Sequence, residues 1–310
     1  MRHRTLLHDV SEDEMANPTT RFGILVGVDG SPGSDAAIQW ATAEAIMRGE
    51  PLTLMHVIAP IVVTWPAVPV AAGISGWQEE RAQLVIGEGR VLVSAAAGES
   101  PAPSVGTEIR HSGVAAGLIE ASRDASMVAV GSRGMGAFGR MRVGSVSTSL
   151  LHHAHAPVAV IRTDQAQAPK HLSPVVLGLC GTSASEEATA LAFEEAGLRG
   201  VDLVALHAWA DTSVTTFLGI DVHRFEQEGH GLLNERLAPW REKFPDVTVR
   251  HRLVVDQPAR RLIDESHDAQ LVVVGSRGRG GFAGMLLGSV SSRVAQDSQA
   301  PTMVVRGRRS

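Results

Sequence analysis

The sequence predicts an α/β protein made of two tandem, doubly wound domains, each built on a five-stranded parallel sheet. Three observations lead to this prediction. The chain has 310 residues, a length that suits about two domains. Its first half recurs in its second half at a nearly constant offset. Within each half, short runs rich in Val, Ile and Leu alternate with helical patterns, which is typical of a parallel sheet covered on both faces.

Glycine-containing segments carry the internal repeat. Gly-Val-Asp-Gly-Ser at 27–31 matches Gly-Leu-Cys-Gly-Thr at 178–182, an offset of 151 that also relates His56 to His207. Gly-Ser-Arg-Gly at 131–134 and Gly-Ser-Val-Ser at 144–147 recur unchanged 144 residues later. Offsets that stay constant over long stretches indicate a duplicated domain with a short deletion in the second copy.

The repeat and the composition set the expected domain limits. We expect a disordered leader over 1–20, a first domain over 21–164, a polar, proline-containing linker over 165–173 and a second domain over 174–310. The leader lacks the apolar stretch of a secretory signal. Because Met15 stands shortly before the first strand, we expect translation to begin there.

Each half contains five apolar runs of strand length. The expected strands are 22–28, 52–58, 105–110, 127–131 and 158–162, then 174–180, 201–208, 247–254, 270–275 and 302–306. Helical patterns fill the gaps, at 33–48, 77–97, 113–125 and 145–155 in the first half. Right-handed crossovers make such a sheet doubly wound, with ligands outside the carboxyl ends of the strands at the switch point. The ends of the first and fourth strands are therefore expected to meet.

Composition and charge exclude several classes of protein. The net charge of −5 gives no electrostatic reason to expect a nucleic-acid partner. One cysteine, Cys180, cannot form an internal disulfide, which suits a reducing cytoplasm. Residues 51–78 hold no Asp, Glu, Lys or Arg, but Pro60, Pro66 and Pro69 argue against a membrane-spanning helix. An apolar loop over a binding site, or a partner surface, is the preferred interpretation of that segment.

The glycine-rich loop after the fourth strand has the chemistry of a phosphate site. Its spacing is Gly131-x-x-Gly134, nine residues, then Gly144-Ser145, and the second copy repeats it. Glycines let turned backbone amides approach an anion, and the helix that follows presents free amides and a favourable dipole. Ser145 and Ser289 can donate hydrogen bonds or cap that helix. Basic side chains near the loop add positive charge: Arg133, Arg140, Arg142, Arg277 and Arg279.

Two rival nucleotide motifs fit less well. Gly134-x-Gly136-x-x-Gly139 matches the dinucleotide fingerprint, but it follows the fourth strand rather than the first, and 156–163 contains no acidic residue. A P-loop would need Gly-Lys-Ser/Thr, which the loop lacks. Glycines that only form a turn are the plain alternative, and the second copy of the loop, with Arg and Ser at matching places, argues against it.

These motifs resemble the universal stress protein family, in particular the tandem-domain, ATP-binding members of mycobacteria and related actinobacteria. The resemblance rests on the loop spacing and on Val-Gly-Val-Asp-Gly-Ser at 26–31, and it covers about 21–308. It implies the adenine nucleotide α-hydrolase-like fold, ATP, with or without Mg²⁺, in each domain, and pairing through the last strands, Val158–Arg162 and Met303–Arg306.

The resemblance and the motifs together nominate the site residues. The first site comprises Gly27, Asp29, Gly131, Ser132, Arg133, Gly134, Met135, Gly136, Ala137, Gly144, Ser145 and Val146. The second comprises Gly178, Asp211, Gly275, Ser276, Arg277, Gly278, Arg279, Gly280, Gly281, Gly288, Ser289, Val290 and Ser291. Copy two departs from the family pattern by placing Cys180 where copy one has Asp29. A thiol is a weaker hydrogen-bonding group than a carboxylate, so we expect the first site to bind more tightly, unless Cys180 is only a buried strand-end residue.

Other conspicuous residues have plainer explanations. His152, His153 and His155 resemble a metal cluster, but copy two has Gln296, Asp297 and Gln299 there. His56 and His207 are expected to be hydrogen-bonded core residues. Trp65, Trp77 and Trp209 suit the pocket mouth or a subunit contact, and equally the core.

The sequence thus predicts a cytoplasmic, ATP-binding regulatory protein rather than an enzyme. The resemblance implies a role in stress survival and growth control, a homodimer through the last-strand edges and an unidentified regulatory partner. Two alternatives stay open. One is a slow ATPase or phosphotransfer enzyme, which needs a residue that positions water or a base near the γ-phosphate. The other is a structural interaction module with vestigial loops.

Overall fold

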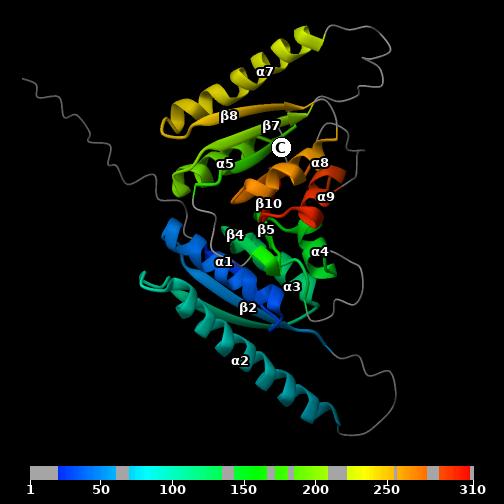
Figure 1. Cartoon of the computed structure of the whole chain (residues 1–310). Coiled ribbons are helices and arrows are strands. Elements are labelled where there is room, and N and C mark those ends of the chain that lie inside the picture. The colour runs from blue at the N-terminus through cyan, green and yellow to red at the C-terminus, as the bar shows by residue number, and fades with distance from the viewer. Residues whose placement is uncertain are drawn as a thin grey trace, which may run out of the picture.

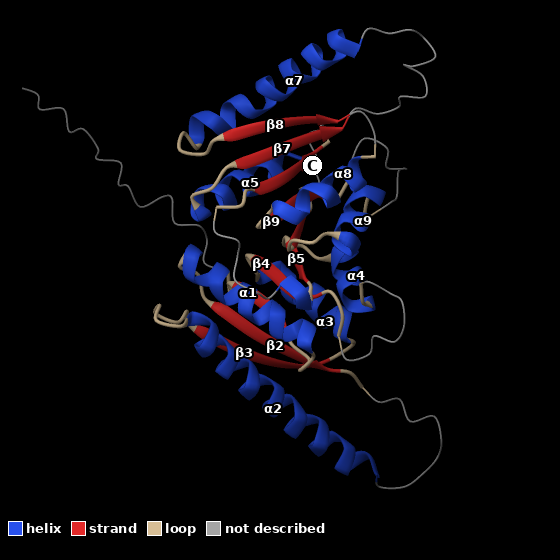
Figure 2. Ribbon diagram, viewed as in Figure 1, coloured by secondary structure: helices blue, strands red, loops and turns tan. Residues whose placement is uncertain are grey.

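The computed structural model describes residues 20–60, 70–134, 143–165, 172–180, 185–208, 222–254, 257–277 and 286–307. Ten strands form one continuous sheet in the order β3-β2-β1-β4-β5-β10-β9-β6-β7-β8, with helices on both faces (Figures 1 and 2). Five consecutive strands at either end belong to one copy of the repeat. The expected leader, apart from its last residue Thr20, and the start at Met15 lie outside the described residues.

The first copy follows the expected alternation of strands and helices. Its elements are β1 (Ile24–Gly27), α1 (Pro32–Arg48), β2 (Leu52–Ile58), α2 (Val70–Ala97), β3 (Val105–His111), α3 (Val114–Ala121), the 3-10 turn η2 (Ser122–Asp124), β4 (Met127–Gly131), α4 (Ser145–His153) and β5 (Val158–Ile161). All neighbouring pairs among these strands are parallel. The largest difference from expectation is α2, which begins seven residues before the expected start at 77.

The second copy repeats this order. Its elements are β6 (Val175–Leu179), α5 (Glu186–Arg199), β7 (Leu203–Ala208), α7 (Val222–Lys243), β8 (Val249–Val254), α8 (Pro258–Glu265), the 3-10 turn η5 (Ser266–Asp268), β9 (Leu271–Gly275), α9 (Ser289–Asp297) and β10 (Thr302–Val305). A further 3-10 turn, η3 (Thr163–Gln165), follows β5. Parallel pairing again holds within the copy, which confirms the predicted fold class.

Alternate residues of each strand feed two separate hydrophobic cores. On β1, Ile24 and Val26 pack into one core and Leu25 into the other. The first core lies under α1, α2, α5 and α7, and the second lies under α3, α4, α8 and α9. Burial on both faces explains why the strands read as continuous apolar runs rather than as alternating patterns. Among the described helices, none is long and apolar enough to cross a membrane.

The two copies join through their last strands. β5 and β10 pair antiparallel, with Ala159 opposite Met303, and each strand also pairs with the fourth strand of its own copy. The implied pairing of last strands is therefore confirmed, but it occurs within one chain. The expected homodimer through those edges needs correction, because both hydrogen-bonding edges of β5 and β10 are already occupied.

A buried charge cluster joins α1 to α5 across this seam. Arg48 pairs with Glu44 at 2.6 Å on its own helix and with Glu195 of α5. Arg199 mirrors it, pairing with Glu195 on its own helix and with Glu44 at 2.6 Å. Glu194 adds a partly exposed carboxylate 2.6 Å from Arg48. The four central residues are related by the repeat offset of 151, so the cluster is itself nearly symmetric.

The cluster holds two carboxylates close together in a buried place. Burial and the charge of Glu44 raise the pKa of Glu195 to about 7, against the opposing effect of the arginines. Burial also acts to raise the pKa of Glu44, but Arg199 and Arg48 outweigh it, so that pKa is lowered. Because the repeat makes the two glutamates near-equivalents, we assign these values to a pair that shares one proton near neutral pH rather than to Glu195 alone.

Candidate functional site

The turn after β1 forms one side of a pocket. Asp29 accepts a hydrogen bond through Oδ1 from the amide of Ser31 at 3.0 Å. Ser31 caps α1 by accepting from the amide of Ser34 at 3.2 Å. Gly30, between Asp29 and Ser31, has φ of +77°, a conformation that favours glycine. Burial, followed by the charges of Glu88 and Asp29, raises the pKa of Asp35 in the first turn of α1, so negative charge gathers on this side.

The glycine loop lies against that turn. A Cβ on Gly131 would stand 2.5 Å from the carbonyl carbon of Gly33 at the start of α1, a separation that real Cβ atoms do not show. A Cβ on Gly134 would overlap the Asp29 carboxylate. Glycine at 131 therefore lets the end of β4 come this close to the start of α1, whereas a side chain at 134 would displace the Asp29 carboxylate. This contact brings together the two signature segments, 27–31 and 131–134.

The N-terminus of α4 forms the opposite side. Gly144 is its N-cap and donates its own amide to the carbonyl of Ser132 at 2.7 Å. The first intrahelical bond runs from Thr148 to Gly144, so the amides of Ser145, Val146 and Ser147 precede the helical ladder. The hydroxyl of Ser147 donates to the carbonyl of Gly131 at 2.7 Å and fixes the helix on the end of β4. The helix end is thus positioned to present amides and positive dipole to an anion.

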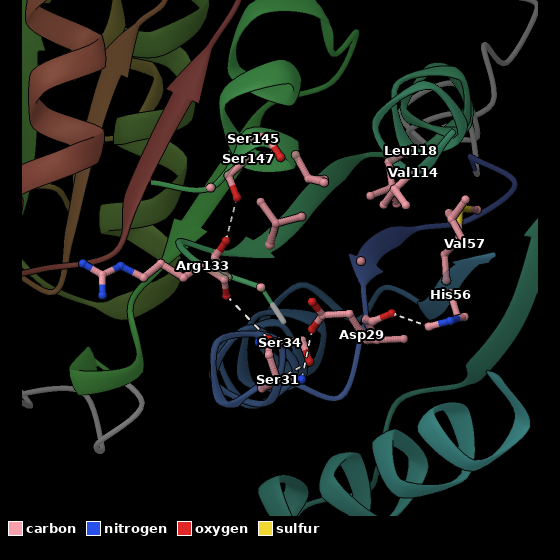
Figure 3. A pocket seen from close by; sticks show the side chains of 18 of the residues that line it. Asp29, Ser31, Ser34, His56, Val57, Val114, Leu118, Arg133, Ser145 and Ser147 are labelled. Carbon is pink, nitrogen blue, oxygen red and sulfur yellow. Dashed lines mark hydrogen bonds between the residues drawn. The ribbon is translucent and has the colours of Figure 1, made fainter. Parts of the chain in front are cut away.

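An apolar wall completes the pocket. Strand β2 and helix α3 line it together with β4 and the start of α4, through Met55, Val57, Val114, Leu118, Val130, Val143 and Val146. The cavity has a volume of about 320 Å³, and Figure 3 shows its polar side chains on the sides described above. Its size and its mixture of an apolar wall with a few polar groups are typical of a small-molecule site.

His56 lies at this wall with a fixed orientation. Its Nδ1 is 2.8 Å from the carbonyl oxygen of Val28. Because a carbonyl only accepts, Nδ1 carries the proton and Nε2 is the acceptor of the neutral ring. The prediction that His56 is a hydrogen-bonded histidine is confirmed, but the residue also lines the pocket.

Most of the predicted first-site residues meet here. Residues that line the cavity are Gly27, Asp29, Gly131, Arg133, Gly134, Gly144, Ser145 and Val146, and Ser132 is buried directly beneath the loop. Arg133 contributes its backbone, because its exposed side chain extends away from the other labelled residues in Figure 3. Ser145 does not cap α4, since Gly144 occupies that position. Met135, Gly136, Ala137, Arg140 and Arg142 lie outside the described residues.

Sequence reasoning missed the apolar wall and the serines of α1. Val114 and Leu118 belong to α3, whose sequence reads as an ordinary core helix. Ser31 is the N-cap of α1 and Ser34 lies in its first turn, where a capping pattern explains both without any ligand. One available signal was topology, because β2 neighbours β1 and must end beside it.

The second copy reproduces the backbone frame. The amide of Gly288 donates to Ser276 at 2.7 Å, and the hydroxyl of Ser291 donates to Gly275 at 2.6 Å. Gly178 sits against Leu262 as Gly27 sits against Leu118. Ser289 and Val290 occupy the first turn of α9 behind the N-cap Gly288, so Ser289 is no cap either. Arg277 is placed directly after Ser276, whereas Asp211, Gly278, Arg279, Gly280 and Gly281 lie outside the described residues.

The copies differ in the side chain after the first strand. Cys180 is half-buried, and its Sγ lies 3.8 Å from the carbonyl oxygen of Arg277. His207 keeps the bond of its counterpart, with Nδ1 2.7 Å from the Leu179 carbonyl, and it is fully buried as expected. A thiol thus replaces a carboxylate in an otherwise similar frame.

The residues set aside from the sequence also have places in the fold. His152 and His153 end α4, and among the described residues no group of three or more His, Cys, Asp or Glu could hold a metal ion. Burial lowers the pKa of His152, with smaller effects of His153 and Arg306 in the same direction. Trp77 is exposed on α2, so the alternative prediction that it packs in the core is wrong. Trp65 and Trp209 lie outside the described residues.

Comparison with known proteins agrees with this architecture. The model of the "Universal stress protein family" matches residues 23–162 and 172–306. A universal stress protein of Mycolicibacterium smegmatis is 53% identical over 95% of this chain and 100% of its own length. The crystal structure of a universal stress protein from Archaeoglobus fulgidus covers 92% of this chain and 98% of its own, with a TM-score of 0.66 and 21% identity.

Another universal stress protein of that archaeon was solved in complex with dAMP. It covers 44% of this chain and 99% of its own, with a TM-score of 0.35 and 21% identity. The two family matches correspond to the two copies of the repeat and together span most of the sequence. The chain therefore belongs to the universal stress protein family, as a member with two tandem domains.

Proposed function

We propose that this chain is a nucleotide-binding regulatory protein that holds ATP in the pocket of each domain. The convergence of the β1 turn, the glycine loop and the N-terminus of α4 around one cavity carries this proposal. Binding itself is the proposed activity. An unidentified partner protein would then recognise a surface that changes with nucleotide occupancy.

The polarity of the pocket supports a single orientation of the nucleotide. Negative charge gathers at Asp29 and Asp35, whereas the end of α4 presents amides and a positive dipole. Phosphates therefore suit the α4 side, with Gly131, Gly134 and Gly144 giving the backbone access to them. The base suits the apolar wall, and the Asp29 carboxylate suits a donor of the adenosine.

The shape of the glycine loop fits such a ligand. Side chains at Gly131 and Gly134 would fill the space where the two strand ends meet, so the cradle depends on glycine. We propose that any Mg²⁺ enters bound to the phosphates, as Mg²⁺ commonly does at nucleotide sites.

The described polar side chains favour binding over catalysis. Asp29 accepts from a backbone amide, Ser147 donates to a backbone carbonyl, and His56 is held by the Val28 carbonyl. These bonds position the walls of the pocket. A phosphotransfer enzyme would instead need a group aligned on an attacking water or hydroxyl.

Nucleotide analysis of the natively purified chain tests the proposal. We expect ATP to co-purify at up to two molecules per chain, and to remain ATP after long incubation. Saturating ATP at 100 times its dissociation constant should add about 2.7 kcal/mol to the free energy of unfolding, read as a rise in melting temperature. Absence of both bound nucleotide and thermal shift would overturn the proposal, and conversion to ADP would favour an ATPase.

A further inference from the structure

Arg81 extends from α2 to the turn that forms one side of the pocket. A Cβ built on Gly30 would stand 3.3 Å from Nη2 of Arg81 and 3.2 Å from Cγ2 of Val85, so the half-buried arginine packs against the turn. Because the Cα atoms of Asp29 and Gly30 are about 3.8 Å apart, the guanidinium lies within roughly 9 Å of the Asp29 Cα. This distance is inside the Debye length of about 10 Å at 0.1 M salt, so the two opposite charges act on each other.

Negative charge gathers around the same turn. Asp29 lines the pocket, Asp35 lies in the first turn of α1, and Glu88 lies further along α2 than Arg81. Burial, followed by the charges of Glu88 and Asp29, raises the pKa of Asp35, so both neighbours are close enough to repel the Asp35 carboxylate. The same repulsion would act on a polyphosphate that enters the pocket.

The second copy has fewer carboxylates at these positions and lacks the arginine. At the offset of 151, Asp29, Asp35, Glu88 and Arg81 correspond to Cys180, Glu186, Pro239 and Leu232. The helices α2 and α7 are compared in register, because the buried Ala82 and Ile86 match the buried Leu233 and Leu237. Arg236 of α7 matches Val85, but it is exposed whereas Val85 is buried. One carboxylate of the three therefore remains in the copy that has no guanidinium at this place.

We infer that Arg81 is a charge-balancing residue of the first pocket, whose guanidinium offsets the carboxylates around the Gly30 turn so that an anionic nucleotide can bind there. This inference rests on the proposed function. A cation beside the turn lowers the repulsion between the phosphates and the acidic side of the pocket. The second pocket, with a thiol in place of the Asp29 carboxylate, has less repulsion to offset.

The place of Arg81 behind the turn suits this role. None of the described residues that line the cavity belongs to α2, so Arg81 acts on the ligand through its charge rather than by contact. A guanidinium inside the cavity would pair with Asp29 and occupy its carboxylate. One behind the turn leaves Asp29 on the cavity wall and still reduces the negative potential there.

Calorimetry on the full chain with ATP, ADP and AMP tests the inference. Arg81→Gln should weaken the first site for ATP about fivefold in roughly 20 mM salt, and the loss should shrink from ATP to ADP to AMP as phosphate charges are removed. About 0.5 M salt should screen most of the loss. A Gly131→Ala chain, which should retain only the second site, supplies the reference for that site. Equal losses for ATP and AMP would show that Arg81 only shapes the turn and would overturn the inference.

Three further variants separate local charge from structure and from net charge. Arg81→Lys keeps the charge and should bind ATP within about twofold of the wild type. Glu88→Gln added to Arg81→Gln removes one nearby carboxylate and should recover part of the lost affinity. Arg90→Gln removes the same charge at an exposed position of α2 and should leave binding unchanged.

The outcomes distinguish this inference from the proposed function. A wild type that takes up no nucleotide would remove both. A wild type that binds ATP while Arg81→Gln binds it equally well, or while Arg90→Gln weakens it as much, would overturn the role of Arg81 alone.

Discussion

The two halves of this chain share a backbone frame and differ in the side chains placed on it. In both halves a serine of the fourth helix, Ser147 or Ser291, donates to the glycine that ends the preceding strand. In both, a histidine of the second strand bonds a carbonyl at the end of the first strand: His56 bonds Val28, and His207 bonds Leu179. The halves differ at Asp29 and its counterpart Cys180, which lie next to the glycine loop. Duplication has therefore kept the geometry of a site while its chemistry differs.

Comparison of the halves separates what the fold requires from what the ligand requires. Features present in both, such as Gly131 and Gly275 at the ends of β4 and β9, belong to the frame. A feature present in one half only, such as the Asp29 carboxylate, concerns what each pocket binds. Predictions can therefore be made for one half with the other as an internal control.

The largest effect is expected for Gly131→Ala. The added methyl would stand 2.5 Å from the backbone of Gly33, so the loop and α1 must separate. We expect ATP binding at the first site to be lost, more than a hundredfold in affinity, while the second site remains. Overpacking of this kind typically costs about 1–3 kcal/mol of stability. Nucleotide content per chain and thermal melts measure both effects.

Gly87→Ala provides the matched control for that variant. A Cβ on Gly87, on the exposed side of α2, would meet nothing within 4 Å. This substitution should leave nucleotide content unchanged and slightly raise the melting temperature, because alanine is the better helix former. Unaltered nucleotide content in Gly131→Ala would refute the close approach of loop and α1.

A smaller effect should distinguish the two pockets. Loss of a hydrogen bond to a charged group costs about 1.5–3 kcal/mol, so Asp29→Ala should weaken the first site by roughly ten- to a hundredfold. Cys180→Ala should change the second site by less than threefold. Titration calorimetry of each variant gives the affinities. Equal losses in the two variants would show that the copies use this position alike.

The smallest effect concerns the charge cluster shared by α1 and α5. Because the pKa of Glu195 is raised, this carboxyl is protonated in the folded chain and ionised in the unfolded chain between pH 4.5 and about 7. This contribution to stability is complete below pH 4.5 and is lost as the pH rises through 7. The lowered pKa of Glu44 affects the pH dependence of stability only below its ordinary value of 4.5, outside that range.

Melting temperatures between pH 5 and 8 test this dependence. The wild type should lose a few degrees as the pH rises. Glu195→Gln and Glu44→Gln should both flatten the slope, since either amide leaves one carboxylate between the two arginines. A slope that disappears in one variant and persists in the other would assign the proton to a single residue and break the symmetry of the pair.

The sequence predicted the strands well and the start of α2 poorly, for physical reasons. Strands such as Leu52–Ile58 are buried on both faces, so their limits appear as apolar runs. Residues 70–76 contain two glycines, and their one capping-type residue, Ser75, stands just before the expected start at 77 rather than before Val70. The domain limits at 20, 164 and 173 stay predictions.

Within the site, the backbone elements could be predicted and the walls could not. The glycines at 131 and 134 indicate from the sequence that the backbone comes close to another group. Nothing in the sequence distinguishes Leu118, which lines the pocket, from a core leucine. The charge cluster was missed because Glu44 and Arg48 read as an ordinary i, i+4 pair on a helix surface. Only the topology places Glu195 and Arg199 beside them, although their recurrence at the repeat offset was a usable signal.

The antiparallel junction of β5 and β10 has a consequence for how the protein responds to concentration. Halves that met only by diffusion would separate on dilution and could pair like with like. A covalent link between them keeps the local concentration of each partner in the millimolar range. Every molecule therefore carries one Asp29-type and one Cys180-type pocket, in a fixed one-to-one stoichiometry at any expression level.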